Sequence, residues 1–465
     1  MTRPQSPPAA NPRPGRAALA AFVGTTIEWY DFYIYGTAAA LVFGKVFFAS
    51  TMNPGVATLL AFVTFWAGFA ARPLGGIVFG HLGDRVGRKT ALVITLVMMG
   101  LATTGIGLLP SYAQIGVWAP VGLVVLRVLQ GIAVGGEWGG AVLIASENAP
   151  KHRSILYAAF AQQGSPTGNL LATGAFFALS ALPTPAFLMW GWRIPFLLSA
   201  VLVVVGMVIR LKLEESADMR RVLKRKRTVK LPLHDVVRDH WPVVLLAAGT
   251  LPVINVTYFR STFALSWATR ELGYAQGTFL GILSMSLVVQ FLMQPVGAWL
   301  VSRIDMRRAM CWILIPEIVL MPVMFHALAT RSYWIAVAGM CVSTIPSAMF
   351  YGAVGGVLAR VFPANVRYTG LSLAYQLSAL VVGGGTPVLA QAILNATGSI
   401  VGVAIASGLY ACVSLVCMLA LLNRTGHRAD ELSSAERSDA AEWGADNTAG
   451  GPEQAGEGGA LKPAG

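Results

Sequence analysis

The chain of 465 residues is 55% hydrophobic and only 12% charged, which is about half the charged fraction of a soluble protein. This composition, with a mean hydropathy of +0.63, excludes a soluble globular protein and predicts an all-α membrane protein that crosses the bilayer many times. The net charge of +13 does not indicate nucleic-acid binding, because the basic residues fall in short stretches between apolar runs.

Twelve apolar segments are long enough to cross a bilayer, which takes about 20 helical residues. The predicted spans are 17–43, 57–79, 90–110, 117–145, 154–182, 193–212, 243–267, 277–301, 309–328, 333–358, 370–394 and 400–423.

A basic loop of about thirty residues separates the sixth span from the seventh and divides the chain into two halves. We expect an N-terminal six-helix bundle over 17–212, a cytoplasmic loop over 213–242 and a C-terminal six-helix bundle over 243–425. The Pro-rich segment 1–16 and the segment 426–465, rich in Ala, Gly and acids, are expected to be disordered tails.

Most Lys and Arg residues lie in the N-terminal tail, the even-numbered loops and the start of the C-terminal tail. Because positive charge concentrates on the cytoplasmic side of a membrane protein, both termini are predicted to be cytoplasmic.

The first span carries two acids, Glu28 and Asp31, in the stretch TTIEWYDFYIYG. A charge at the bilayer centre costs about 2.5–3.5 kcal/mol, and helical spacing puts both acids on one face with Tyr35. We expect at least one of them to bind and release a proton during transport, with Asp31 favoured because it lies deeper in the span. The alternative is a structural salt bridge to Arg127 or Arg72.

The fourth span carries Arg127 in the apolar run LRVLQGIAVGG, with Gln130 and Glu137 on the same side of the helix. Arg127 is expected to hold a carboxylate, either the proton-carrying acid or an anionic substrate, and Glu137 is a further candidate for proton coupling. The alternative is a static ion pair that fixes helix packing.

In the second half, Arg260 and Tyr258 of the seventh span are candidates for substrate binding, because a cation facing a central cavity suits a carboxylate. A snorkelling arginine is the alternative. Glu317 in the ninth span has no obvious partner, and structural and functional roles are equally consistent with it. The further candidates for substrate contact are Tyr30, Tyr35, Gln130, Tyr375 and Gln376, of which the last two could equally form hydrogen bonds between helices.

The loop after the second span reads GHLGDRVGRKT, with acid and base at a glycine-flanked turn. It is expected to act as a cytoplasmic latch, and the alternative is an ordinary turn with topology-setting charges. The latch candidates are Gly80, Asp84, Arg85, Gly87 and Arg88. The related loop after the eighth span matches this pattern less well, since Ser302 stands where the acid is expected.

GHLGDRVGRK matches the pattern G-x-L-x-D-R-x-G-R-[RK] of the major facilitator superfamily, and LRVLQGIAVGG resembles its fourth-span motif. More narrowly, TTIEWYDFYIYGTAAALVF, LQGIAVGGEWGGAVL, WGWRIPFLLS and VRYTGLSLAYQ resemble the metabolite:proton symporter family, most closely its shikimate-type branch. The resemblance implies a major facilitator fold of twelve transmembrane helices in two bundles that alternate around a central site.

The function that the resemblance implies is proton-coupled import of a small carboxylated metabolite across a bacterial inner membrane. The expected partners are protons, an organic acid and the lipid bilayer, with a monomeric carrier, no nucleic acid and no cofactor beyond the proton gradient. The alternatives are a proton-coupled importer of zwitterionic osmolytes such as betaine or proline, and a non-transporting membrane sensor.

An enzyme is disfavoured, because the spans contain neither H-E-x-x-H nor G-x-S-x-G. Four cysteines without paired spacing and six scattered histidines predict neither a disulfide framework nor a metal site.

Overall fold

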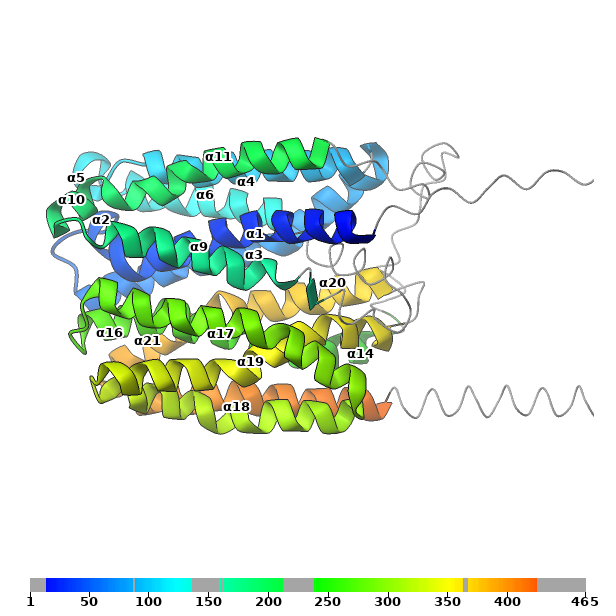
Figure 1. The fold of residues 1–465 in the computed structure, drawn as a ribbon. Helices are drawn as coiled ribbons and strands as arrows, with labels where there is room; N and C mark the ends of the chain where they lie inside the picture. The colour runs from blue at the N-terminus through cyan, green and yellow to red at the C-terminus, as the bar shows by residue number, and fades with distance from the viewer. Residues whose placement is uncertain are drawn as a thin grey trace, which may run out of the picture.

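The computed structural model describes residues 14–86, 88–135, 159–160, 162–211, 238, 240–362 and 367–424. Long helices run side by side along one axis, and the first and the last of them have their outer ends at the same end of the molecule (Figure 1). Helix is present within every one of the twelve predicted spans. Residues 1–13, the predicted tail 426–465 and most of the predicted loop 213–242 lie outside the described residues, whereas Pro14–Arg16, expected to be disordered, form the start of a helix.

The N-terminal half, as far as it is described, runs from the first helix to the sixth span. Its elements are α1 (Pro14–Ala38), η1 (Ala39–Phe43), α2 (Gly44–Val46), α3 (Pro54–Val86), α4 (Arg88–Leu108), α5 (Tyr112–Ile115), α6 (Trp118–Val134), α9 (Gly164–Leu179), α10 (Thr184–Met189), η3 (Gly191–Arg193) and α11 (Ile194–Leu211).

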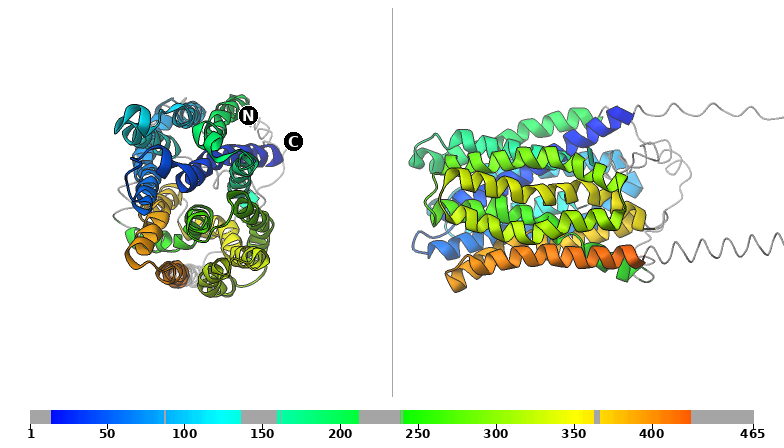
Figure 2. Two further views of the ribbon diagram at one scale, coloured as in Figure 1. Left: turned by 90° about the vertical axis from the view of Figure 1, so that its left-hand side faces the viewer. Right: turned by 60° about the horizontal axis from the view of Figure 1, so that its bottom comes forward.

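The C-terminal half begins at the seventh span, and the two halves form separate groups of helices in the end-on view (Figure 2). Its elements are α14 (Trp241–Gly249), α15 (Pro252–Tyr258), η4 (Phe259–Phe263), α16 (Ala264–Arg270), α17 (Gln276–Arg303), α18 (Met306–Ala329), α19 (Tyr333–Val361), α20 (Arg367–Ser378), η5 (Ala379–Gly383) and α21 (Gly385–Thr397), followed by a final helix, Val401–Arg424.

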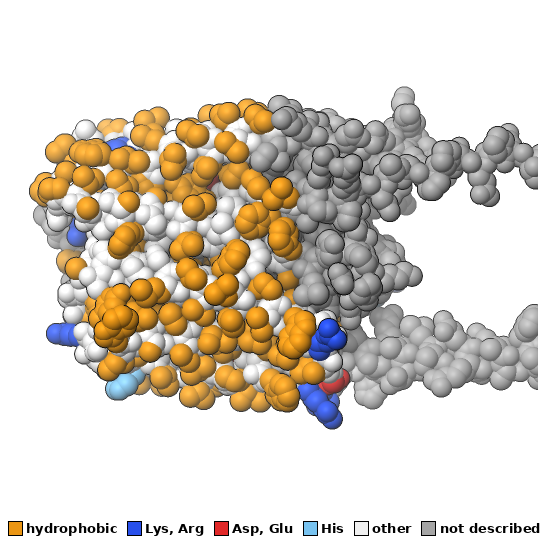
Figure 3. Space-filling view, in the orientation of Figure 1, with side chains coloured by type: hydrophobic (Ala, Val, Ile, Leu, Met, Phe, Trp, Pro, Cys, Tyr) orange, Lys and Arg blue, Asp and Glu red, His pale blue; other side chains and the backbone are white. Residues whose placement is uncertain are grey.

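The outer surface of the helical part suits a lipid environment. Within the described residues, eight helices are long and apolar enough to cross a membrane, and two further apolar helices, Val93–Leu108 and Trp118–Val134, are shorter. One face of the molecule is covered by hydrophobic side chains, and its visible charges lie near the two ends (Figure 3). The fold is that of a polytopic helical membrane protein.

Glycines bring helices together in the same way in both halves. In the N-terminal half, a Cβ on Gly75 would lie less than 3.0 Å from the backbone of Ile132, and one on Gly131 equally close to that of Gly68. In the C-terminal half, Gly297 would meet the backbone of Met349 in the same way. The pairs α3–α6 and α17–α19 therefore pack backbone against backbone, as small residues allow in membranes, and this shared device supports an internal repeat.

Within the part of the chain that the structure describes, three spans contain a π-helical turn, at η1, η4 and η5. Such turns widen an α-helix locally and are frequent at functional sites. The seventh span is also interrupted at Thr250–Leu251, directly before Pro252 starts α15. These irregularities reorient the residues that follow, and η4 carries Arg260.

The halves touch near both ends of the helical core. The Trp66 indole N–H donates to the Leu380 carbonyl at 2.7 Å, and the Gln376 amide donates to the Gly135 carbonyl at 2.6 Å. At the end away from the chain termini, the Arg270 guanidinium donates to the Pro54 carbonyl at 3.0 Å and also to the Thr58 hydroxyl. These hydrogen bonds join the two halves on either side of the space between them.

Candidate functional site: a central cavity and a buried acid

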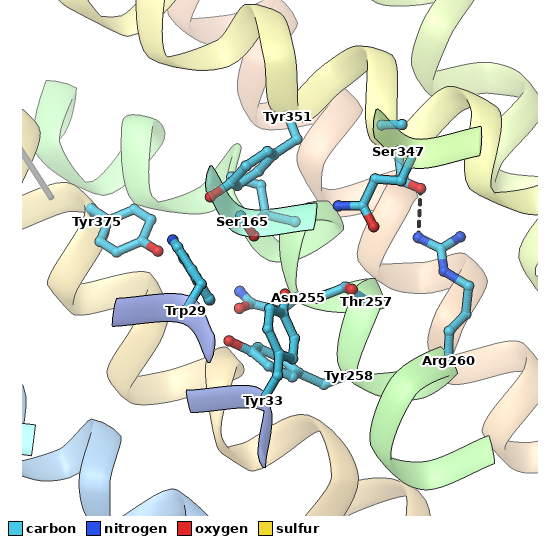
Figure 4. A pocket seen from close by; sticks show the side chains of 13 residues that line it. Trp29, Tyr33, Ser165, Asn255, Thr257, Tyr258, Arg260, Ser347, Tyr351 and Tyr375 are labelled. Carbon is cyan, nitrogen blue, oxygen red and sulfur yellow. Dashed lines mark hydrogen bonds between the residues drawn. The ribbon is translucent and has the colours of Figure 1, made fainter. Parts of the chain in front are cut away.

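A small cavity lies between the two halves (Figure 4). Both halves supply its walls: the lining residues are Trp29, Tyr33, Ser165, Ile254, Asn255, Thr257, Tyr258, Arg260, Gln290, Ser347, Ala348, Tyr351 and Tyr375.

The cavity combines aromatic walls with one cationic end. The Tyr33 and Tyr258 rings lie 6.3 Å apart, so one side of the cavity is a pair of phenols contributed by different halves. Arg260 lies at the other side, where its Nη2 donates to the Ser347 hydroxyl at 2.7 Å (Figure 4). The Trp29 indole nitrogen has no hydrogen-bond partner among the described residues and is a free donor at the wall. Such a cavity suits a small molecule with an anionic group and a polar, partly apolar body.

Helix α1 presents two different faces. Trp29 and Tyr33, four residues apart, line the cavity. Asp31 lies between them in sequence and therefore points to another side of the helix, where it is 1% exposed. One helix thus connects the cavity wall to a buried acid.

Asp31 is held by hydroxyl groups from two neighbouring helices. The Ser199 hydroxyl of α11 donates to Oδ1 at 2.6 Å, and the Thr103 hydroxyl of α4 lies 3.1 Å from Oδ2. The Thr103 hydroxyl is also 2.9 Å from the Met99 carbonyl. Because a hydroxyl has one proton to donate, Thr103 can turn that proton to Met99 when Asp31 is protonated and to Asp31 when it is charged.

Arg127 reaches Asp31 indirectly. Its Nη1 donates to the Gln130 amide oxygen at 2.9 Å, and the Gln130 amide nitrogen donates to the Thr103 hydroxyl at 2.6 Å. The guanidinium carbon lies 4.1 Å from the ring centres of both Phe32 and Tyr35, a geometry in which aromatic faces stabilise a desolvated cation. Arg127 is completely buried within the N-terminal half.

The other acid of the first span, Glu28, is buried at 7% exposure. Its charge acts on Tyr375, as does that of Arg72. Arg72 also lies over the Phe32 ring, 4.4 Å from its centre, so this ring contacts two guanidinium groups. Glu28 therefore belongs electrostatically to the region near the cavity residue Tyr375, while Asp31 belongs to the interior of the N-terminal half.

The candidates chosen from sequence divide into three groups. Arg260, Tyr258 and Tyr375 line the cavity. The interior of the N-terminal half contains Arg127 and Gln130, together with Tyr30 and Tyr35, whose hydroxyls donate to the Pro195 carbonyl at 2.9 Å and to Thr64 at 2.7 Å. Gln376 joins the two halves outside the cavity lining.

Other candidates cannot be placed. Glu137 and Gly87 lie outside the described residues. Gly80, Asp84 and Arg85 fall in the last turns of α3, and Arg88 begins α4. The expectation of a turn at Asp84 and Arg85 is therefore wrong, because the second span continues as helix to Val86. The side chains of these residues are not described. The latch remains a prediction.

Several lining residues were not identified from the sequence: Trp29, Tyr33, Ser165, Asn255, Gln290, Ser347 and Tyr351. Trp29 and Tyr33 could have been found, since they share one helical face adjacent to the acids. The others are uncharged residues in apolar spans and give no comparable signal. Among the described residues, no group of three or more His, Cys, Asp or Glu side chains could hold a metal ion.

Comparison with known proteins gives consistent matches. The profile of the "Sugar (and other) transporter" family matches residues 17–230. The shikimate transporter of Escherichia coli (strain K12) is 40% identical over 85% of this chain and 91% of its own length. The inner membrane metabolite transport protein YhjE of the same organism is 39% identical over 81% of this chain and 87% of its own. The proline/betaine transporter of E. coli (strain K12) is 32% identical over 81% of this chain and 77% of its own.

Solved structures share the fold. A partially occluded, inward-open structure of the xylose transporter XylE from E. coli aligns with a TM-score of 0.67 at 17% identity, over 88% of this chain and 97% of that one. The proton:xylose symporter XylE bound to 6-bromo-6-deoxy-D-glucose aligns with a TM-score of 0.69 at 17% identity, over 88% and 95% of the two chains.

Proposed function

Because the chain belongs to the metabolite:proton symporter family of the major facilitator superfamily, we propose that it imports a small carboxylated metabolite together with a proton. The family consists of transporters and not enzymes. The central cavity is the proposed substrate site, and rocking of one half against the other exposes it alternately to each side of the membrane.

The observation that carries the proposal is the position of Arg260. Its guanidinium lies in the wall of a cavity shared by both halves, and among the described lining residues it is the one charged side chain. A carboxylate beside it would form charge-assisted hydrogen bonds, each contributing about 1.5–3 kcal/mol. The ring-bearing walls would hold the body of the substrate, and the free Trp29 N–H would donate to one of its oxygens.

Asp31 is the proposed proton site. It is almost fully buried, and the hydroxyls of Ser199 and Thr103 can accommodate both its charged and its neutral form. Protonation would remove a buried negative charge, whose placement in the bilayer interior is costly. Since α1 carries both Asp31 and the cavity residues Trp29 and Tyr33, a change at the acid would move the cavity wall.

The remaining assignments follow the same proposal. Glu28, Arg127 and Glu137 assist proton coupling, and the segment 80–88, where α3 ends and α4 begins, acts as the cytoplasmic latch. The carrier is a monomer in the bacterial inner membrane with both termini in the cytoplasm. The name of one relative supports the inner membrane, and the distribution of Lys and Arg supports the orientation. The proton gradient is the driving force, and no cofactor is required.

A second candidate substrate is a zwitterionic osmolyte. Five aromatic residues line the cavity, namely Trp29, Tyr33, Tyr258, Tyr351 and Tyr375, and aromatic faces bind quaternary ammonium groups. Four relatives at 32% identity are named as betaine or proline transporters.

Uptake by the purified protein in proteoliposomes tests these possibilities. Under an imposed inward proton gradient, labelled shikimate, succinate, citrate, proline and glycine betaine are compared, with and without a protonophore. We expect protonophore-sensitive accumulation of a carboxylate that carries no positive charge. Accumulation of betaine or proline alone would support the osmolyte importer, and no accumulation of any of them would favour a sensor without transport.

A further inference from the structure

Glu317 is a buried acid in the C-terminal half to which the proton pathway described above assigns no role. It lies in α18 with no exposed surface. Its Oε2 accepts a hydrogen bond from the backbone N–H of Ser347 at 3.1 Å, and its Oε1 has no hydrogen-bond partner among the described residues. A charged carboxylate with an unpaired oxygen in a membrane interior is costly, so this acid needs a proton or a nearby cation.

The nearby cation is Arg260, and one turn of α19 connects the two. Pro346 lies inside this helix, where a proline lacks an N–H and disturbs the preceding turn. Arg260 Nη1 donates to the Ser343 carbonyl at 2.8 Å and Nη2 to the Ser347 hydroxyl at 2.7 Å. The turn from Ser343 to Ser347 thus binds Arg260 by an oxygen at each end and Glu317 by the N–H of Ser347.

The two charges differ in access to the cavity. Arg260 and Ser347 line it, whereas Glu317 does not. The residues around Glu317 are the uncharged Ser343 and Ser347 of α19 and Arg260 of η4. Among the described residues, Arg260 is the charged group that interacts electrostatically with Glu317. Arg260 in turn interacts electrostatically with Glu317 and, across the cavity, with Tyr33. Glu317 is therefore placed to modulate Arg260 without touching the substrate.

We propose that a proton on Glu317 controls how firmly Arg260 holds the substrate carboxylate. When Glu317 is charged, Arg260 and Glu317 together are neutral, and an incoming carboxylate gains little net attraction. When Glu317 is protonated, the charge of Arg260 is uncompensated and attracts the carboxylate strongly in this low-dielectric site. Proton and carboxylate then bind to this half together as a neutral pair. This inference rests on the proposed function of the cavity and makes Glu317 a positioning residue in the substrate half.

The sign of the pH dependence follows from this linkage. Proton binding at Glu317 favours carboxylate binding, so affinity is high at low pH and falls as pH rises. For one linked proton, the dissociation constant increases by at most about tenfold per pH unit. An uncharged ester of the same acid does not interact with Arg260 through a charge, and its affinity is independent of pH.

The test measures carboxylate affinity against pH for the purified full-length protein in detergent, with shikimate, succinate and citrate as probes and a methyl ester of the bound acid as comparison. In Glu317→Gln, which mimics the protonated acid, we expect the affinity to stay at the low-pH value of the wild type, constant to within about twofold across the pH range. The matched control is Asp305→Asn, which removes an exposed acid from the same helix and keeps an N-cap residue that can accept from the Arg308 N–H.

Two results separate the failure of this inference from the failure of the proposed function. If the wild type binds a carboxylate and Glu317→Gln retains the same pH dependence, the role of Glu317 is refuted while the carboxylate site stands. If none of the three acids binds the wild type at any pH, the carboxylate site itself fails and the role of Glu317 with it.

A second measurement does not depend on the folding of Glu317→Gln. Proton uptake during carboxylate binding is followed with a pH indicator in weakly buffered solution. We expect carboxylate binding to take up protons in the wild type and still to take up a proton in Asp31→Asn, because Glu317 remains; any proton that Asp31 binds adds to the uptake of the wild type alone. Loss of the uptake in Asp31→Asn would assign the linked proton to the N-terminal half and overturn the proposal.

Discussion

The two halves of the molecule each bury an arginine and an acid, but the arginine lies at a different place relative to the cavity in each half. In the N-terminal half, Arg127 and Asp31 both lie behind the cavity wall and are connected through Gln130 and Thr103. In the C-terminal half, Arg260 lies on the wall and Glu317 behind it, connected through one turn of α19.

The difference suggests that the two halves have different roles in transport. The N-terminal network is built from side chains that can exchange hydrogen bonds without moving far, which suits a site that gains and loses a proton. The C-terminal cluster places its cation on the cavity, which suits a site that binds an anion. Four substitutions test this comparison, taken from the largest expected effect to the smallest.

Replacing Arg127 by Gln should have the largest effect on transport. The substitution removes the cation that lies over Phe32 and Tyr35 and that binds Gln130. We expect the initial rate of proton-driven uptake to fall by about 100-fold or more, equivalent to about 2.7 kcal/mol. Arg303→Gln, at the exposed end of α17, is the matched control, and a fully active Arg127→Gln carrier would reduce this arginine to a packing role.

Replacing Arg260 by Gln should weaken substrate binding rather than proton coupling. We expect the KM for the carboxylate to rise by about 10- to 100-fold, which corresponds to the free energy of one lost charge-assisted hydrogen bond. The affinity for the uncharged methyl ester should change by no more than about twofold. Equal losses for acid and ester in a binding assay would show that Arg260 only supports the fold of α19.

Replacing Thr103 by Val removes the hydroxyl between Gln130 and Asp31 and keeps the shape of the side chain. Leaving a buried acceptor unsatisfied costs about 1–3 kcal/mol, so proton-driven uptake should slow by about tenfold with an unchanged KM. Thr103→Ser should restore the rate, and Thr104→Val on the adjacent position of α4 should have no effect. A raised KM at a normal maximal rate would place Thr103 in substrate binding instead.

Replacing Thr58 by Val should give the smallest effect. Thr58 accepts a hydrogen bond from Arg270 at the end of the molecule away from the termini, and the Pro54 carbonyl remains as a second acceptor. Losing about 1 kcal/mol should favour the state that is open at this end. The apparent affinity for substrate added on that side should improve by up to about fivefold, because more of the carrier is competent to bind.

The matched control for this contact is Thr269→Val in α16, whose hydroxyl donates only within its own helix, to Leu265 and Ser266. An unchanged affinity in Thr58→Val would show that Arg270 does not help to close this end.

The fold was accessible from the sequence because lipid imposes a simple length and polarity rule on each span. Asp31 and Arg127 were also recognisable, since charges in apolar runs are conspicuous. The prediction that Glu28 and Asp31 share a face with Tyr35 was less informative, because helical spacing does not say which neighbour each residue meets. In the structure Asp31 meets Thr103 and Ser199, and Tyr35 meets Thr64.

The C-terminal cluster was not accessible in this way. Glu317 had no evident partner in sequence, because the Ser347 N–H that it binds belongs to the next helix and Arg260 is supplied by the seventh span. Prolines were the available signal, because a proline inside a helix marks backbone groups that take partners from elsewhere: Pro316 and Pro322 lie in the helix of Glu317 and Pro346 in the next one. The lining residues Ser165, Asn255, Gln290, Ser347 and Tyr351 gave no such signal and became visible only when the spans were packed against each other.

The most direct test of a proton site in the N-terminal half compares accumulation and exchange in proteoliposomes carrying wild-type protein or Asp31→Asn, with Asp305→Asn as the control. We predict that Asp31→Asn does not accumulate the carboxylate under an imposed proton gradient, yet still exchanges labelled for unlabelled carboxylate at a rate near that of the wild type. Undiminished, protonophore-sensitive accumulation by Asp31→Asn would contradict the account.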